Sequence, residues 1–231
     1  MKQDSKSESA DISDKIIKNV GNYLNLIKNC KRKSVFRGQS NVEWSLLPSI
    51  LRQNNCTPEK EKQLFLEFKM EYYQYTTERP KNDMELLFLA QHYGLPTRLI
   101  DWSYNPLVAL FFACNSNEDK DGVVYCKTLE GEIREKNEGD NKPMTINQII
   151  NNDKSLFVIP DRTDVRYINQ KALFMLCGKD CQEKEKLDKY IINKKYKKDI
   201  IEELTLLGFD EHFIFPSLDK LCSDITKKIF K

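Results

Sequence analysis

The sequence predicts an α+β protein with one domain, built on a small mixed or antiparallel sheet flanked by helices. Two observations lead to this prediction. Segments with helical and with strand periodicity are mixed along the 231 residues without a regular βαβ repeat. In addition, 40% of the residues are apolar and 31% are charged, which is enough to form a sizeable core with a well-solvated surface.

The N-terminal half alternates capped helices with short strands. Residues 1–10 are polar and are expected to be a disordered tail, followed by one domain over 11–231 with its core at about 34–225. Apolar residues at helical spacing predict a helix over 11–29. Thr57-Pro58 and Asn105-Pro106 both pair an N-cap residue with a proline at the first helical position. The remaining expected elements up to residue 126 are a strand 34–38, a helix 83–93, a strand 97–102, a helix 107–113 and a strand 122–126.

The C-terminal half is less regular. The span 127–142 is charge-dense and contains glycine, which predicts a mobile excursion. The expected elements beyond it are a helix from Thr145, a strand 157–159, a helix or turn 163–168, a strand 172–176, a helix 196–207 ending at Gly208, a strand 213–215 and a helix from Ser217.

Composition excludes several classes of function. The 37 basic and 35 acidic residues nearly cancel, so no overall field indicates nucleic acid or membrane. No apolar run approaches the roughly 20 residues that span a bilayer, and no secretory leader is evident. The seven cysteines are expected to be reduced thiols of a cytoplasmic protein. With only two histidines and no second ligand pair beside Cys177 and Cys181, no metal site is predicted.

The first candidate for function is Arg37, at the end of a strand and directly before Gly38. Its planar guanidinium can bind a phosphate or pyrophosphate through two hydrogen bonds while the glycine allows close approach of the backbone. The alternative is an ordinary surface arginine on an edge strand.

The second candidate is the run from Gln91 to Trp102, which surrounds a tight Gly-Leu-Pro connection. Asp101 and Trp102 lie where a strand ends, a common place for functional side chains. The alternatives are an Asx-turn aspartate, a tryptophan in the core, and a structural salt bridge for Arg98. His92, in the last turn of a helix, is either a base or an ordinary hydrogen-bonding residue.

The third candidate is Asn169-Gln170, before the apolar strand 172–176; turn chemistry explains these residues equally well.

Four segments together resemble the FRG-domain family. They are FRGQSNVEWSLLPSILR (36–52), LAQHYGLPTRLIDWSYNPLVALFFA (89–113), NQKALF (169–174) and LGFDEHFIFPSLDKLC (207–222). The layout also resembles, more distantly, the ADP-ribosyltransferase fold, in which a first strand carries an arginine and a third strand opens with a glutamate. The resemblance implies an NAD-using enzyme, a toxin or antiviral defence effector, that modifies a macromolecular acceptor, either nucleic acid or protein.

In that interpretation NAD is a substrate and no metal takes part. Arg37, Asp101, Gln170 and His92 are the candidate catalytic residues. The candidate cofactor-binding residues are Phe36, Gly38, Gln39, Gln91, Tyr93, Arg98 and Trp102, with Tyr93 or Trp102 stacking on nicotinamide. Gln170 stands where the enzymes carry glutamate, and it cannot stabilise a cation as glutamate does, so Asp101 or His92 would supply the charge.

Two other functions remain open. One is a non-catalytic module that binds nucleotide, nucleic acid or protein in the same groove. The other is a hydrolase such as a nuclease, although such an enzyme needs clustered carboxylates for metal. The transferase interpretation requires Arg37, the turn at Asp101 and Trp102, and Gln170 to lie at one cleft.

Overall fold

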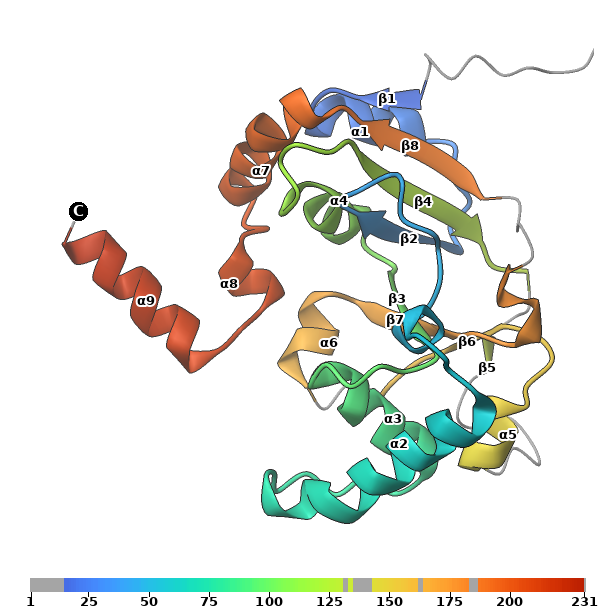
Figure 1. Cartoon of the computed structure of the whole chain (residues 1–231). Helices are drawn as coiled ribbons and strands as arrows, with labels where there is room; N and C mark the ends of the chain where they lie inside the picture. The colour runs from blue at the N-terminus through green and yellow to red at the C-terminus, as the bar shows by residue number, and fades with distance from the viewer. Residues whose placement is uncertain (1–14, 131–132, 135–142, 162–163, 183–186, 231) are drawn as a thin grey trace, which may run out of the picture.

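A computed structural model describes residues 15–130, 133–134, 143–161, 164–182 and 187–230. The predicted α+β class is confirmed, since one mixed sheet is flanked by helices (Figure 1). Within the described residues the sheet has eight strands in the order β1-β8-β4-β2-β3-β7-β6-β5. The two outermost pairs are parallel and the five inner pairs are antiparallel.

The first half of the sheet is covered by one group of helices. Its strands are β1 (Ile16–Ile17), β8 (Asp188–Ile192), β4 (Gly122–Thr128) and β2 (Ser34–Gln39). The helices on it are α1 (Val20–Ile27), α4 (Pro106–Cys114) and α7 (Lys197–Leu206). They share one core with Phe36, Val124 and Tyr190 of the sheet.

A second group of helices covers the same face of the other half (Figure 1). The strands there are β3 (Leu99–Ser103), β7 (Ala172–Leu176), β6 (Leu156–Val158) and β5 (Ile133–Arg134). The helices on it are α2 (Pro58–Glu71), α3 (Asp83–His92) and α5 (Ile146–Ile150). The opposite face of both halves packs around Val35, Trp102 and Phe157.

The two halves meet at a single residue pair. β2 pairs with β4 over six positions, but with β3 only through Phe36 and Ser103. Beyond that pair the two strands separate. The gap lies on the helical face, between α4 on one side and α6 (Val165–Asn169) on the other. The sheet therefore opens directly beside Arg37.

Local chemistry explains most of the elements. Thr57 accepts a hydrogen bond from the Lys60 amide, and Asn105 accepts one from the Leu107 amide, so both predicted N-caps are confirmed. Gly208 has φ +82°, where glycine is favoured, and it ends α7 as predicted.

Several predicted elements were wrong. The helix predicted over 11–29 begins only at Val20, because Ile16–Ile17 pairs with β8 and Asn19 caps the helix. The strand predicted over 213–215 is the short helix α8 (Glu211–Ile214), which Asp210 caps. Strand β8 was missed because its sequence, DKYII, lies within a charged region and has only three apolar residues.

The prediction of a mobile excursion over 127–142 was also wrong in part. β4 continues through Lys127 to Thr128, and Ile133–Arg134 forms β5. Residues 131–132 and 135–142 of that segment and the predicted N-terminal tail lie outside the described residues.

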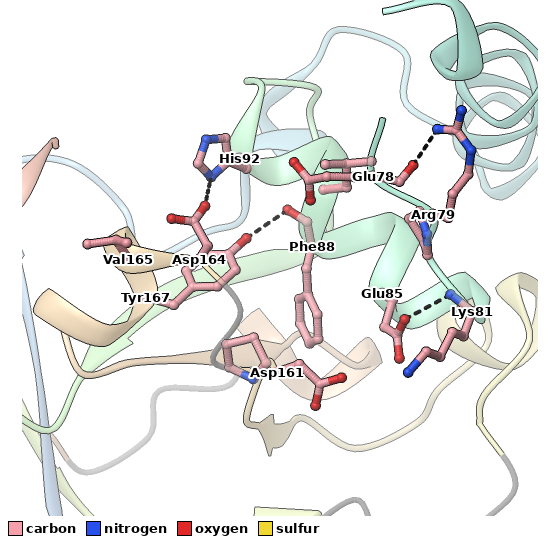
Figure 2. Close-up of a pocket in the computed structure, with 13 residues that line it drawn as sticks. Glu78, Arg79, Lys81, Glu85, Phe88, His92, Asp161, Asp164, Val165 and Tyr167 are labelled. Carbon is pink, nitrogen blue, oxygen red and sulfur yellow. Dashed lines mark hydrogen bonds and ion pairs between the residues drawn. The ribbon is translucent and has the colours of Figure 1, made fainter. Parts of the chain in front are cut away.

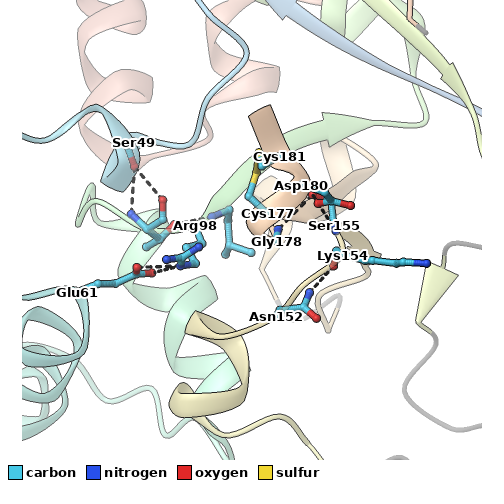
Figure 3. Close-up of a disulfide and its surroundings, with 12 residues drawn as sticks. Ser49, Glu61, Arg98, Asn152, Lys154, Ser155, Cys177, Gly178, Asp180 and Cys181 are labelled. Atoms are coloured by element: carbon cyan, nitrogen blue, oxygen red, sulfur yellow. Dashed lines mark hydrogen bonds and ion pairs between the residues drawn. A yellow bond between two sulfur atoms is a disulfide. The ribbon is translucent and has the colours of Figure 1, made fainter. Parts of the chain in front are cut away.

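The cysteines differ from the expectation of reduced thiols. Cys177, directly after β7, forms a disulfide with Cys181, with their Cα atoms 5.2 Å apart (Figure 3). The intervening Gly178 lies directly against the backbone of Lys154 and Ser155, where a Cβ would not fit. Cys30, Cys56, Cys114, Cys126 and Cys222 are free thiols.

Candidate functional site: a cleft where the sheet divides

The gap between β2 and β3 forms a cleft with a volume of about 160 Å³. Strand residues form its floor, α4 forms one wall and α6 forms the other. The residues that line it are Phe36, Arg37, Gly38, Asp101, Trp102, Ser103, Val108, Ala109, Phe112, Arg166 and Gln170. The three groups of candidate residues, separated by up to 134 positions in the sequence, thus meet at one place.

Arg37 bridges the gap where the ladder between β2 and β3 is broken. Its Nη1 donates a hydrogen bond to the backbone oxygen of Asp101 at 2.7 Å and lies 3.8 Å from the Asp101 carboxylate. Its side chain is 18% exposed, and its Nε is buried without a hydrogen-bond partner among the described residues. Burial lowers the pKa of Arg37, and Asp101 partly offsets this effect. Since β2 lies inside the sheet, the alternative of an arginine on an edge strand does not hold.

Asp101 presents a carboxylate to the cleft. Its side chain is 61% exposed and lies among the residues that line the cleft. Gln91 of α3 donates to the carboxylate from 3.3 Å and accepts a hydrogen bond from the Thr97 hydroxyl. Gln91 therefore orients Asp101 from outside the cleft.

Gln170 occupies the turn between α6 and β7. Its side-chain nitrogen donates to the Ile214 oxygen at 2.9 Å, and its backbone oxygen accepts from the Ser103 hydroxyl at 2.6 Å. Gln170 therefore ties β3 and α8 together at the edge of the cleft.

Gly38 lines the cleft and also has a role in packing. Its Cα faces the backbone of α4, and a Cβ there would lie 2.7 Å from the Ala113 nitrogen and closer still to the Ala109 oxygen. The glycine therefore allows α4 to lie directly on β2. Its lack of a side chain serves helix packing.

Four predicted binding residues do not line the cleft, namely Gln91, Arg98, Gln39 and Tyr93. Arg98 is buried, and its Nε donates to both carboxylate oxygens of Glu61 at 2.7 and 2.8 Å, as Figure 3 shows. Burial raises the pKa of Glu61, although Arg98 opposes this. Gln39 is buried, and Tyr93 is 63% exposed at the end of α3.

Trp102 lines the cleft but is 2% exposed, and its ring packs edge-on against Phe157 in the core of the opposite face. The aromatic residues available to a ligand on the helical face are Phe36 and Phe112.

His92 lies at a second, larger cavity of about 530 Å³ between α3, α6 and the loop before α3 (Figure 2). Its Nδ1 is 3.1 Å from the Asp164 carboxylate. The Tyr167 hydroxyl donates to the Phe88 oxygen, and burial, with Asp164 nearby, raises the Tyr167 pKa. Because α6 contributes Arg166 to the cleft and Val165 and Tyr167 to this cavity, with Asp164 as its N-cap, it lies between the two sites.

Arg166 is the cleft residue that sequence reasoning missed. It lies in α6, where a lone arginine carried no visible signal beside Asn169-Gln170. Its guanidinium lies 5.1 Å from the centre of the Phe215 ring.

The protein is therefore an α+β protein with a polar cleft at the point where its sheet divides. Residues 32–122 match the family model described as FRG domain. The match includes Arg37 and Asp101 and ends before Arg166, Gln170 and the segment 207–222. No curated protein and no solved structure matches the chain.

Within the described residues, no helix is both long and apolar enough to cross a membrane. The same residues contain no group of three or more His, Cys, Asp or Glu side chains placed to hold a metal ion.

Proposed function

We propose that this protein is an ADP-ribosyltransferase-like enzyme that uses NAD to modify a macromolecule, with the β2–β3 cleft as its donor site. The observation that carries the proposal is the meeting of Arg37, Asp101 and Gln170 at one cleft. The resemblance to that fold, taken from the sequence, rests on a strand that carries an arginine between an aromatic residue and a glycine, here Phe36-Arg37-Gly38.

The cleft suits one part of a dinucleotide. Its volume of about 160 Å³ is below the roughly 300 Å³ at which drug-sized pockets begin, so the adenosine end would lie outside. Arg37 would bind the pyrophosphate, since arginine stays protonated and presents paired donors. Phe112 would pack against the nicotinamide ring.

The chemistry follows from these positions. Nicotinamide leaves with the electron pair of its glycosidic bond, and the ribosyl carbon becomes cationic. The Asp101 carboxylate stabilises that charge and accepts the proton of the acceptor nucleophile that then bonds to the carbon. The side-chain nitrogen of Gln170 donates a hydrogen bond to the Ile214 backbone oxygen. The side-chain oxygen of Gln170 would therefore accept a hydrogen bond from a ribose hydroxyl.

The test is incubation with NAD labelled in the ADP-ribose part, together with total cell protein or RNA, while released nicotinamide is measured. We expect label transfer by the natural sequence, a higher KM in Arg37→Lys, and a lower kcat in Asp101→Asn. Asp153→Asn is the matched control, since that carboxylate is exposed and pairs only with Lys179 on the surface. Equal activity of Asp101→Asn and Asp153→Asn would refute the assigned role of Asp101.

A second candidate function is a non-catalytic nucleotide-binding module. The neutral Gln170, at the position where the enzymes carry glutamate, favours it. Binding of NAD or ADP-ribose that depends on Arg37, with no nicotinamide release and no label transfer, would select this function over the transferase.

A further inference from the structure

Arg166 is a partly buried cation at the wall of the cleft. Its backbone amide donates to Asp164, but its guanidinium has no hydrogen bond or ion pair with any described residue. The guanidinium lies over the Phe215 ring, 5.1 Å from its centre. A guanidinium held on an aromatic ring is stabilised in place while its N–H donors stay available.

Phe215 is itself held in position. Asn169 donates to the Phe213 oxygen at 2.8 Å, and Gln170 donates to the Ile214 oxygen at 2.9 Å. These two bonds fix the end of α8 against α6. Phe215 also packs edge-on against Phe112, with ring centres 5.6 Å apart. Phe215, held by these contacts, therefore positions the guanidinium of Arg166 at the wall of the cleft.

Arg37 supplies the second set of donors at the same cleft. One of its nitrogens is occupied by the Asp101 backbone, whereas its Nε is buried without a described partner. Two arginines face one carboxylate among the lining residues, so the cleft has a net positive charge. Paired arginines with unused N–H groups fit the oxygens of a phosphate or pyrophosphate.

The larger cavity has the opposite character. Four carboxylate residues, Glu78, Glu85, Asp161 and Asp164, line it against two cationic ones, Arg79 and Lys81. Figure 2 shows Glu78, Glu85, Asp161 and Asp164 among the residues that line it. An anionic ligand is repelled there, although that cavity has more room.

We propose that Arg166, supported by Phe215, is the second phosphate-binding residue of the cleft and acts with Arg37 on the pyrophosphate of a nucleotide. The inference rests on the proposed function for the identity of the ligand. Pyrophosphate binding needs no turnover, so it can hold where transfer fails. A cleft walled by α4 and α6 takes a compact group more readily than a continuous nucleic-acid backbone.

The experiment measures the Kd of inorganic pyrophosphate and of ADP-ribose by calorimetry, using the whole chain. We expect Arg166→Gln to weaken both by about tenfold or more, as the loss of charge-assisted hydrogen bonds does. The Kd of adenosine, which carries no phosphate, measures how much of the affinity for ADP-ribose comes from the nucleoside alone. The matched control is Arg79→Gln, because Arg79 also lies over a ring, 5.3 Å from the centre of Tyr73, but lines the larger cavity.

Three results would overturn the inference. They are no binding of pyrophosphate by the natural sequence at millimolar concentration, unchanged affinity in Arg166→Gln, or an equal loss in Arg79→Gln. Tighter, Arg166-dependent binding of a short single-stranded RNA would also overturn the assignment to a nucleotide. If Arg166→Gln does not fold, Phe215→Leu serves instead, because it keeps the charge of Arg166 but removes the ring under the guanidinium. We expect Phe215→Leu to weaken pyrophosphate binding severalfold. Unchanged affinity in this variant would overturn the inference.

Discussion

Substitution of Gly38 by alanine is expected to destabilise the fold strongly. The added Cβ would lie 2.7 Å from the Ala113 nitrogen, about 0.7 Å inside the 3.4 Å at which ordinary van der Waals contact begins. It would lie closer still to the Ala109 oxygen. Both atoms belong to the backbone of α4, so no side chain can rotate away and the helix must move off β2.

The cost follows from the size of that movement. Overpacking a core by one methyl group typically costs about 1–3 kcal/mol, and clashes with backbone lie at the upper end. We therefore expect Gly38→Ala to lower the free energy of unfolding by about 3 kcal/mol or more. For a chain of this length that corresponds to a fall in Tm of about 6–12 °C.

Gly21→Ala is the matched control for this substitution. Gly21 lies inside α1, and the nearest atom to a Cβ there is 3.6 Å away. Alanine is the better helix former by about 0.5–1 kcal/mol, so this variant should be more stable than the natural sequence. Urea unfolding measures both variants. A Gly38→Ala variant within 0.5 kcal/mol of the natural sequence would refute the proposed packing of α4 on β2.

Two further predictions concern buried groups in the first half of the sheet. Lys197→Met should lower the free energy of unfolding by about 3 kcal/mol in urea, because the buried ammonium donates to three backbone carbonyls that methionine would leave unpaired. A loss below 1 kcal/mol would contradict this. Burial raises the pKa of Cys114 from 9.0 to about 12, so above pH 9 the thiol loses its proton in the unfolded chain first and stability falls, by about 1 kcal/mol at pH 10. Cys114→Ala should lack this part of the loss between pH 7.5 and 10, and equal losses in both proteins would count against it.

The sequence was most informative where one residue type has a single local use. Thr57 and Asn105, each followed by proline, predicted two helix starts that the structure has. By contrast, Ile16 and Ile17 fit a helical pattern but pair with β8, a contact across more than 170 positions. Helical periodicity alone does not reveal such a partner, so tertiary pairing overrode the pattern.

The same holds for the candidate site, where sequence neighbours indicated some residues and contacts between distant segments decided the others. Arg37 and Asp101 could be selected because glycine follows one and a turn was expected after the other. The predicted strand ends were wrong, since Arg37 lies within β2 and Asp101 within β3. Arg98 looked equally suitable, but its partner Glu61 lies 37 positions away on α2 and buries it. Arg166 could not be selected, because its importance comes from Phe215 and the wall of the cleft, which exist only in the folded chain.

The tripeptide Phe36-Arg37-Gly38 creates the cleft by three different physical effects. Phe36 forms the last pair between β2 and β3, and its ring packs under α4. Arg37 then crosses the gap and satisfies the carbonyl of Asp101 that a continued ladder would have paired. Gly38 lets α4 approach closely enough to form the wall. A substitution at any of these positions therefore acts on the shape of the cleft, even where the contacts of a ligand are made by other residues.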